Sequence, residues 1–460
     1  MLPKTKTIFI TIFHGHLARN ILRTKVLSLL ARQANLEIVI IAPDFKKEYY
    51  QKEFGQSNVV IEGLSVFRPT RLDSFFRSLY YYFVDTQTVK IVQQEQFFLT
   101  GRYVKYFVVR LLTLIFGNLA FLRRLVRFFD SHLVGLNKEV ELLFERYQPT
   151  LVVASQVMAD QDVMFLRSAK SRHIRSIGMV RSWDNITVNK GNVRVHPDNY
   201  LAQNELMKNE LVKYTEANIE NIKVTGLTHF DYYADEKSRI PRTDFAKSIG
   251  ADPEKRYIYF MPIGLSDEGQ DERMIMFLSK ILAKHDELKN YELLVSLHPN
   301  TEKTFCTDKI PGVVFINTSH CLISFSDGKI TDREISNQAM EIMASSIYHS
   351  DLVINYQGTS SIDAAAFDKP VINIDFDEIK KPYLNSIRRY YDFEHYQPIL
   401  KSKGVRLAHN FEQLEELILL YIKDPSLDRE YRARMVYEQG FYSDGKSCEQ
   451  TVLAILKNIE

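Results

Sequence analysis

Residues 351–375 read DLVINYQGTSSIDAAAFDKPVINID, and this stretch decides the fold. Residues 352–354 and 371–374 are short apolar runs, which are typical of buried parallel strands. Between them, residues 357–361 form a polar turn, and a helix-forming run follows until Pro370 ends it. The stretch therefore predicts a strand, a polar turn, a short helix and a second strand.

The polar turn in this stretch is a candidate phosphate site. A Gly/Ser/Thr turn that opens a helix after a parallel strand presents backbone N–H groups and the positive end of the helix dipole to an anion. An ordinary turn with a capping box from Ser360 to Asp363 fits the same letters, so both interpretations stay open. The residues predicted to bind the donor here are Gln357, Gly358, Thr359, Ser360 and Ser361.

Composition and charge narrow the class of protein. The chain has 460 residues, of which 45% are hydrophobic and 25% charged, and this is typical of a globular protein with two or three domains. A formal net charge of +2 argues against a nucleic-acid-binding protein. Three cysteines without metal-binding spacing indicate a reduced, cytoplasmic chain. The apolar run at 7–13 is too short for a signal peptide and is predicted to be the first strand.

Each half of the chain alternates strand patterns with helix patterns, which predicts two parallel, doubly wound α/β domains. We predict the first domain at 1–235 and the second at 236–440, joined by a polar linker that contains Pro241 and Pro253. Residues 441–460 are predicted to form a C-terminal helix that can pack back on the first domain.

Loops that follow the strands of such a sheet gather at its carboxyl edge, where doubly wound folds bind ligands. In the first domain the candidates on these loops are His14, His16, Trp183, Asp184, Asn185 and Lys190. His14, His16 or Asp184 can act as a general base, and Lys190 can meet a phosphate. Trp183 and Asn185 would lie on the acceptor side. The alternatives are loop histidines without a role, Trp183 as a core anchor, and an Asx turn at Asp184.

An insertion at about 71–135 is rich in aromatic and basic residues. Its longest apolar run, 111–122, is shorter than the roughly 20 residues that a membrane-spanning helix needs. Helices that mix aromatic and arginine faces often lie on anionic membrane surfaces, and Arg123, Arg124 and Arg127 fit that role. The alternative is a helical hairpin that packs on the sheet with snorkelling arginines.

Four short motifs follow one another along the chain: VTG at 224–226, LHP at 297–299, the stretch at 351–370, and DGKS at 444–447. In their order the chain resembles the GT-B class of nucleotide-sugar transferases. It is similar above all to surface-carbohydrate enzymes related to CDP-glycerol glycerophosphotransferases and to the non-hydrolysing UDP-N-acetylglucosamine 2-epimerases. The Asp-Tyr-Ser-Ser pattern of the glycerophosphotransferases is spread here by an inserted Gln-Gly-Thr.

The resemblance implies two Rossmann-like domains facing a central cleft, with a nucleotide-sugar donor bound by the second domain. His298 would be catalytic by donating to the departing phosphate, beside Pro299, and Gly264 would let a backbone N–H approach that phosphate. Asp363 would bind ribose hydroxyls or only cap its helix. His395 would contact the sugar or phosphate.

The resemblance also implies that the enzyme needs no cofactor. The sequence Asp375-Phe-Asp377 looks like a metal-diphosphate motif, but it follows a core strand late in the chain. That position is wrong for the metal-dependent transferase fold, so we expect no metal.

Together these patterns predict a metal-independent glycosyltransferase that acts on a glycan or lipid-linked acceptor. It would be cytoplasmic and peripheral to the inner face of the membrane. The alternatives are a nucleotide-sugar 2-epimerase of the same architecture, a CDP-glycerol-type glycerophosphotransferase, or a non-catalytic scaffold in polysaccharide assembly. The insertion is superfluous for epimerisation, which favours a transferase.

Overall fold

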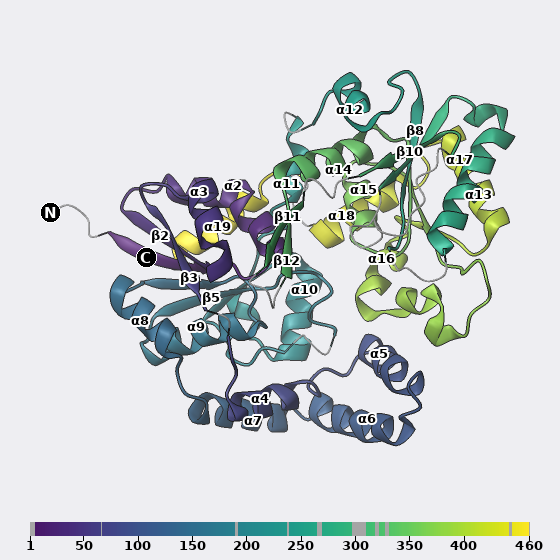
Figure 1. The fold of residues 1–460 in the computed structure, drawn as a ribbon. Coiled ribbons are helices and arrows are strands. Elements are labelled where there is room, and N and C mark those ends of the chain that lie inside the picture. Colours follow the sequence, from purple (N-terminus) through teal and green to yellow (C-terminus); the bar gives the residue numbers. More distant parts are fainter. Residues whose placement is uncertain are drawn as a thin grey trace. The chain divides into compact units, whose positions relative to one another are not determined.

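The computed structural model describes residues 5–459 apart from 66, 189–191, 237–238, 265–268, 297–309, 318–321, 327–330 and 441–443. The chain forms two compact units (Figure 1). Unit 1 consists of Met1–Asp231, Ser324–Glu334 and Gly440–Glu460. Unit 2 consists of Tyr232–Ile323 and Ile335–Gln439.

Unit 1 is built on a parallel sheet with the strand order β3-β2-β1-β4-β5-β6-β7. Its first strands read as nearly continuous Val/Ile runs because helices cover both faces of the sheet. The seven strands are β1 (Lys6–Thr11), β2 (Leu36–Pro43), β3 (Val59–Leu64), β4 (Leu151–Ala154), β5 (Arg175–Met179), β6 (Asn199–Ala202) and β7 (Ile222–Val224).

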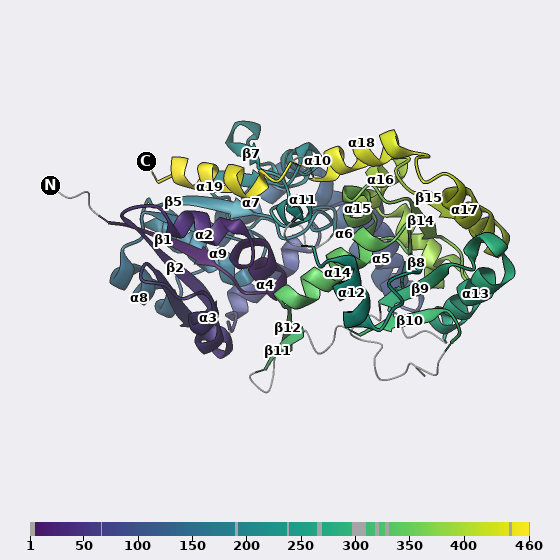
Figure 2. The same cartoon turned by 90° about the horizontal axis from the view of Figure 1, so that it is seen from above.

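The helices of unit 1 bury the two faces of this sheet. One core contains residues of α2 (Lys25–Ala31), α3 (Lys47–Phe54) and α19 (Ser447–Lys457), and the opposite core contains residues of α8 (Lys138–Tyr147) and α9 (Asp160–Ser171). Figure 2 shows α19 lying along the sheet beside α2. The Asp231 carboxylate accepts hydrogen bonds from the N–H groups of Ser447 and Cys448, and it so caps the start of α19.

A small two-stranded sheet of β11 (Leu322–Ser326) and β12 (Thr331–Ile335) supplies the middle segment of unit 1. The buried Lys46 ammonium lies 2.5 Å from Asp332 and 2.6 Å from Glu334, and the Tyr50 hydroxyl donates to Glu334. Residues 324–334 fall inside the range predicted for the second domain, and the structure groups them with unit 1. Charge pairing of a buried lysine therefore fixes a segment that is distant in sequence.

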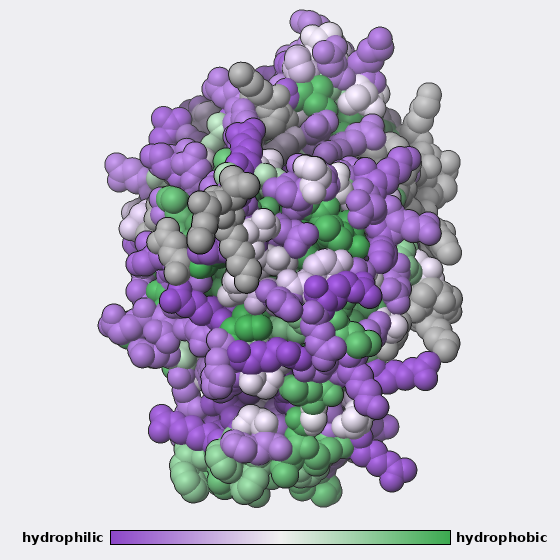
Figure 3. Space-filling model, turned by 90° about the vertical axis from the view of Figure 1, so that its left-hand side faces the viewer, coloured by the Kyte–Doolittle hydropathy of each residue, from purple (hydrophilic) through white to green (hydrophobic). Residues whose placement is uncertain are grey.

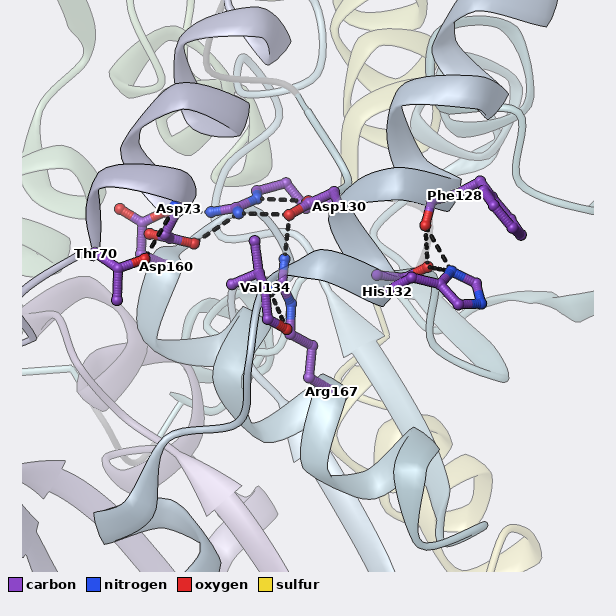
Figure 4. Close-up of polar contacts among 10 residues, drawn as sticks. Thr70, Asp73, Phe128, Asp130, His132, Val134, Asp160 and Arg167 are labelled. Atoms are coloured by element: carbon purple, nitrogen blue, oxygen red, sulfur yellow. Dashed lines mark hydrogen bonds and ion pairs between the residues drawn. The ribbon is translucent and has the colours of Figure 1, made fainter.

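The insertion of unit 1 consists of four helices: α4 (Arg71–Tyr80), α5 (Gln87–Phe98), α6 (Tyr103–Asn118) and α7 (Ala120–Leu133). A buried ionic cluster fastens it to the sheet domain (Figure 4). Asp130 of α7 accepts from Arg167 of α9 at 2.6 Å and from Arg194 at 3.0 Å, and Arg194 also donates to Asp73 of α4 at 2.7 Å. The insertion is therefore held by hydrogen-bonded charges with little exposure.

Unit 2 is built on a second parallel sheet with the order β10-β9-β8-β13-β14-β15. Its six strands are β8 (Arg256–Met261), β9 (Tyr291–Ser296), β10 (Val313–Ile316), β13 (Leu352–Asn355), β14 (Val371–Ile374) and β15 (Arg406–Ala408). Its longer helices are α12 (Arg242–Ile249), α13 (Gln270–Lys284), α14 (Asn337–His349), α17 (Phe411–Lys423) and α18 (Arg429–Gly440).

The stretch at 351–375 forms β13, the short helix α15 (Ser360–Ala366) and β14, as predicted. β13 lies at the centre of the sheet, between β8 and β14. Two parallel-sheet α/β units confirm the predicted fold class.

Candidate functional site

A cavity of about 780 Å³ opens at the carboxyl edge of the unit 1 sheet. The loops after β1, β4 and β5 form one part of its wall, and the end of α4 forms another. This is the edge at which doubly wound sheets bind ligands. The polar and aromatic residues that line the cavity are His14, Arg77, Ser78, Tyr80, Tyr81, Tyr82, Gln156, Asp160, Gln161, Arg181, Asn192 and Arg194.

A buried aspartate holds two of these loops in place. Asp162, in the first turn of α9, accepts a 2.5 Å hydrogen bond from the Thr11 hydroxyl and a 3.1 Å bond from the Gln156 N–H. The Ser155 hydroxyl in turn donates to the Thr11 carbonyl. Burial raises the pKa of Asp162 to about 7, because no cation is among the groups that bond it. The ends of β1 and β4 are thus tied together beneath the cavity.

Gln156 connects these strand ends to the loop that follows β5. Its side-chain carbonyl accepts from the Arg181 N–H at 2.8 Å, and its amide donates to Asn185 at 3.1 Å. The Asn185 amide donates to the Asp184 carboxylate at 3.1 Å. Our sequence analysis missed Gln156, although a polar residue directly after a buried strand at this edge was a usable signal.

The structure separates the two candidate histidines. His14 is half-buried at the N-cap position of α1 (Gly15–Leu17) and lines the cavity, whereas the His16 side chain is exposed and does not. Burial and the nearby Arg181 cation lower the pKa of His14, so its imidazole is neutral at pH 7. Within the described residues, no carboxylate lies within ion-pair distance of the Arg181 guanidinium. His14 is therefore a neutral imidazole beside a cation that has no carboxylate partner in the described part of the chain.

The other predicted acceptor-side residues are less directly placed. Asp184 is half-buried and does not line the cavity, although Asn185 connects it to Gln156. Trp183 packs against the apolar cluster around Ile186, which agrees with the core-anchor alternative. Lys190 lies outside the described residues. Of the two candidate bases His14 and Asp184, only His14 lines the cavity.

In unit 2, one polar side chain of the predicted phosphate turn, that of Ser361, points into the protein interior. Ser361 is fully buried, and its hydroxyl lies 3.2 Å from the Tyr396 hydroxyl and 3.0 Å from the Asn373 amide. The Tyr396 hydroxyl donates to Asn373 at 2.6 Å, and Asn355 bonds both Ser360 and Ser361. These side chains form one closed network across β13, α15 and β14.

The other residues of the turn are less buried than Ser361. Gln357, Gly358 and Thr359 are half-buried at the carboxyl end of β13. The N–H of Asp363 donates to the Thr359 carbonyl, and the Asp363 carboxylate accepts from the Tyr233 hydroxyl at 3.1 Å. Asp363 thus holds Tyr233, which precedes the predicted linker. Ligand binding by this turn remains a prediction that concerns its main chain and Ser360 more than Ser361.

A second buried aspartate organises the loop after β8. Gly264 has a left-handed φ of 71°, and its N–H donates to Asp271 of α13 at 3.1 Å. The Ile263 N–H donates to the same carboxylate at 3.3 Å, and burial raises the pKa of Asp271 to about 6. The Gly264 amide, predicted to approach a phosphate, therefore already has an internal acceptor.

The other predicted donor-side residues have the following places. His298 and Pro299 lie outside the described residues. His395 is buried, and its ring lies 5.6 Å from that of Phe393. Asp375 lies 2.7 Å from His409, and Asp377 accepts from the Ile387 N–H. Across the described parts of the chain, no group of three or more His, Cys, Asp and Glu side chains is placed to hold a metal ion.

No protein-family model and no curated protein matches the chain. Solved structures do share its fold. The UDP-GlcNAc 2-epimerase from Neisseria meningitidis, solved bound to UDP-GlcNAc, superposes with a TM-score of 0.55 at 13% identity over 98% of this chain and 100% of that one. The UDP-GlcNAc 2-epimerase from Methanocaldococcus jannaschii gives 0.50 at 14% identity over 94% and 98%. A glycosyltransferase from Rickettsia africae gives 0.50 at 13% over 99% and 100%. At these identities the likeness shows the fold, and the chain has the GT-B fold that the sequence predicted.

Proposed function

We propose that the protein is a glycosyltransferase that moves a sugar from a nucleotide-sugar donor to a surface-polysaccharide or lipid-linked acceptor. The observation that supports it most directly is the unit 1 cavity, in which the neutral His14 lies beside Arg181, a cation with no carboxylate partner among the described residues. A neutral imidazole can take a proton at pH 7, and an unpaired arginine can hold an anionic group of an acceptor.

In the proposed reaction, an acceptor hydroxyl bound in unit 1 attacks the anomeric carbon of the donor sugar. The new oxygen–carbon bond forms as the bond from that carbon to the nucleotide phosphate breaks. The acceptor proton passes to the imidazole of His14, and the nucleotide leaves with the electron pair. The turn at 357–360 of unit 2 would bind the nucleotide phosphate, since main-chain N–H groups after a strand favour an anion.

A nucleotide-sugar 2-epimerase is the second candidate. Two of the three superposed proteins bear that name, and the fold fits this reaction as well. An epimerase would change one carbon centre of the donor without an acceptor. The four-helix insertion favours the transferase, because the aromatic residues at the end of its first helix, Tyr80–Tyr82, line the cavity in a position where an acceptor would be bound. A CDP-glycerol-type transferase would use the same base and a different donor.

The experiment begins with a thermal-shift screen of UDP, CMP, CDP, GDP and their sugars, because only a ligand that prefers the folded state raises the midpoint. The nucleotide-sugar that gives the largest shift is then incubated with the protein, with and without a membrane lipid extract. Release of free nucleotide that requires the extract supports the transferase. A 2-epimer formed without the extract contradicts it and supports the epimerase. Both assays are repeated with EDTA, which we expect to leave the activity intact.

A further inference from the structure

The helix α7 of the insertion is amphipathic in the reverse sense to an ordinary surface helix. Its charged residues Arg123 and Asp130 are 6% and 0% exposed. Its apolar residues Phe121 and Phe128 are 71% and 55% exposed. A surface helix in water normally buries its apolar stripe and exposes its charges. The orientation of α7 therefore suits an environment that is apolar on its outer side.

Charge pairs fix this orientation. Arg123 and Arg127 both donate to Glu216, and Arg127 also donates to the Val193 carbonyl at 3.0 Å. On the next turn Asp130 pairs with Arg167 and Arg194. Turning the phenylalanines inward would leave several buried charges without partners, which is strongly unfavourable. Arg123 and Arg127, which the sequence analysis assigned to a lipid surface, are instead internal ties.

The helix α6 shows the same reversal. Thr113 is fully buried and accepts a 2.8 Å hydrogen bond from the buried Gln93 of α5, whereas Val104 and Phe107 are 80% and 65% exposed. We name the outward surface of the two helices the α6–α7 face, and Figure 3 shows apolar residues gathered at the lower end of the molecule, where α7 lies. The face consists of Val104, Phe107, Val108, Leu111, Leu114, Ile115, Leu119, Phe121, Leu125, Phe128, Phe129 and Leu133.

The charged residues of α6, and those of α7 before Asp130, have a single sign. Residues 96–129 contain no Asp or Glu but contain six Arg and Lys residues. Three of these, Arg102, Lys105 and Arg124, are exposed. An apolar surface with a cationic border is complementary to an anionic lipid surface. It is poorly complementary to a second copy of itself, because an isologous contact would bring like charges together.

The shape of the pair decides how it can meet a bilayer. In the described part of the chain, no single helix is long and apolar enough to cross a membrane; α6 and α7 pass that test only together, and they meet at 90°. A helix that is too short to span, with one apolar face, binds by lying in the interface with that face buried among the lipids.

We propose that the α6–α7 face is a docking surface for an anionic bilayer, with its apolar side chains in the acyl boundary and Arg102, Lys105 and Arg124 at the headgroups. The inference rests on the insertion alone and does not depend on the proposed reaction. If both hold, the insertion that contacts the membrane also forms part of the wall of the unit 1 cavity. Such an enzyme suits an acceptor whose sugar is linked to a lipid.

The test is flotation of the full chain with vesicles of phosphatidylglycerol and phosphatidylcholine, and with phosphatidylcholine vesicles alone. We expect binding to the anionic vesicles at low salt and at least a tenfold loss of bound protein in Phe107→Ser/Phe121→Ser/Phe128→Ser. Arg102→Glu/Lys105→Glu should weaken binding at least threefold at low salt and less at high salt, where charges are screened. The matched control is Leu453→Ser, an exposed leucine on α19 that should change nothing.

Circular dichroism and the unfolding midpoint establish that each variant is folded, and the variants leave the internal ties of Arg123, Arg127 and Asp130 intact. Equal binding to both kinds of vesicle would overturn the anionic requirement. Absence of flotation at low salt would overturn the proposal. Analytical ultracentrifugation would then test whether a second copy of the chain covers the α6–α7 face. A dimer that dissociates in the triple phenylalanine variant would assign the face to a second copy.

Discussion

Asp162 in unit 1 and Asp271 in unit 2 lie at similar positions, and each carboxylate orders a loop that follows a β-strand. Each lies in the first turn of a helix, and each accepts hydrogen bonds from the polypeptide that follows a β-strand. Asp162 also accepts from the hydroxyl of Thr11 on a neighbouring strand, whereas the bonds of Asp271 to described residues come from two consecutive main-chain N–H groups. A buried carboxylate can thus order the loop at the end of a β-strand. The number of loops that it orders depends on which groups donate hydrogen bonds to it.

The two strand edges differ in where their polar side chains point. In unit 1, His14 and Arg181 line a cavity. In unit 2, Ser361, Asn373 and Tyr396 bond one another and are buried. The difference indicates that unit 1 offers side-chain chemistry at its edge, while unit 2 uses its side chains to hold a main-chain turn. Four predictions test this contrast.

The largest expected effect is on the pH dependence of stability. Because burial raises the pKa of Asp162 from 3.8 to about 7, the folded protein holds this proton at pH values where the unfolded chain has lost it. The contribution is present below about pH 4 and is lost as the pH rises to about 7, a change of about 4 kcal/mol. Relative to the wild type, Asp162→Asn should therefore gain stability across this window, as measured by urea unfolding at pH 4 to 8.

Asp271→Asn is the matched variant for that comparison. The pKa of Asp271 is raised to about 6, so its window ends lower and its gain should be nearer to about 3 kcal/mol. A larger gain for Asp271→Asn than for Asp162→Asn would contradict the ranking of the two sites.

The next effect is loss of stability on opening the network of unit 2. Asn373→Ala removes a fully buried amide that bonds Ser361 and Tyr396, and it should cost roughly 2–4 kcal/mol in the free energy of unfolding. Tyr396→Phe removes one hydroxyl and should cost about 1–2 kcal/mol. The exposed Asn385→Ala serves as the control and should have almost no effect. A loss of less than about 1 kcal/mol in the free energy of unfolding for Asn373→Ala would contradict the closed hydrogen-bond network.

The third effect is on catalysis. His14→Ala should lower turnover by about 10²-fold, as loss of a general base typically does, while the unfolding midpoint stays unchanged. His16→Ala should change turnover far less, since His16 is exposed and does not line the cavity. The rates are measured with the nucleotide-sugar found by the thermal-shift screen. If His16→Ala has the larger effect, the assignment of the base is wrong.

The smallest expected effect is at Gly264. A side chain at its left-handed φ of 71° is strained, so Gly264→Ala should cost about 1 kcal/mol of stability. Gly135→Ala, which meets no atom within 4 Å and has no left-handed φ, should be nearly neutral. Differential scanning calorimetry of both variants decides this, and equal midpoints would contradict it.

Local patterns in the sequence predicted the elements well, because strand and helix periodicity is written in neighbouring residues. The apolar runs around Pro370 became β13 and β14 for this reason. The side-chain contacts were harder to predict. The inward turn of Ser361 depends on Tyr396, which lies 35 residues away. Arg123 shows a second limit: periodicity reveals that a helix has two faces and does not tell which one meets the protein.

The placement of residues 324–334 has a consequence for dissection of the molecule. The chain passes between the units four times, at 231/232, 323/324, 334/335 and 439/440. No uninterrupted stretch of the gene encodes either unit, and a protease that cuts once would release neither. A fragment that stops at 231 would also keep Lys46 without its carboxylate partners Asp332 and Glu334. Truncation of the gene at one position therefore cannot produce either unit as a complete fragment.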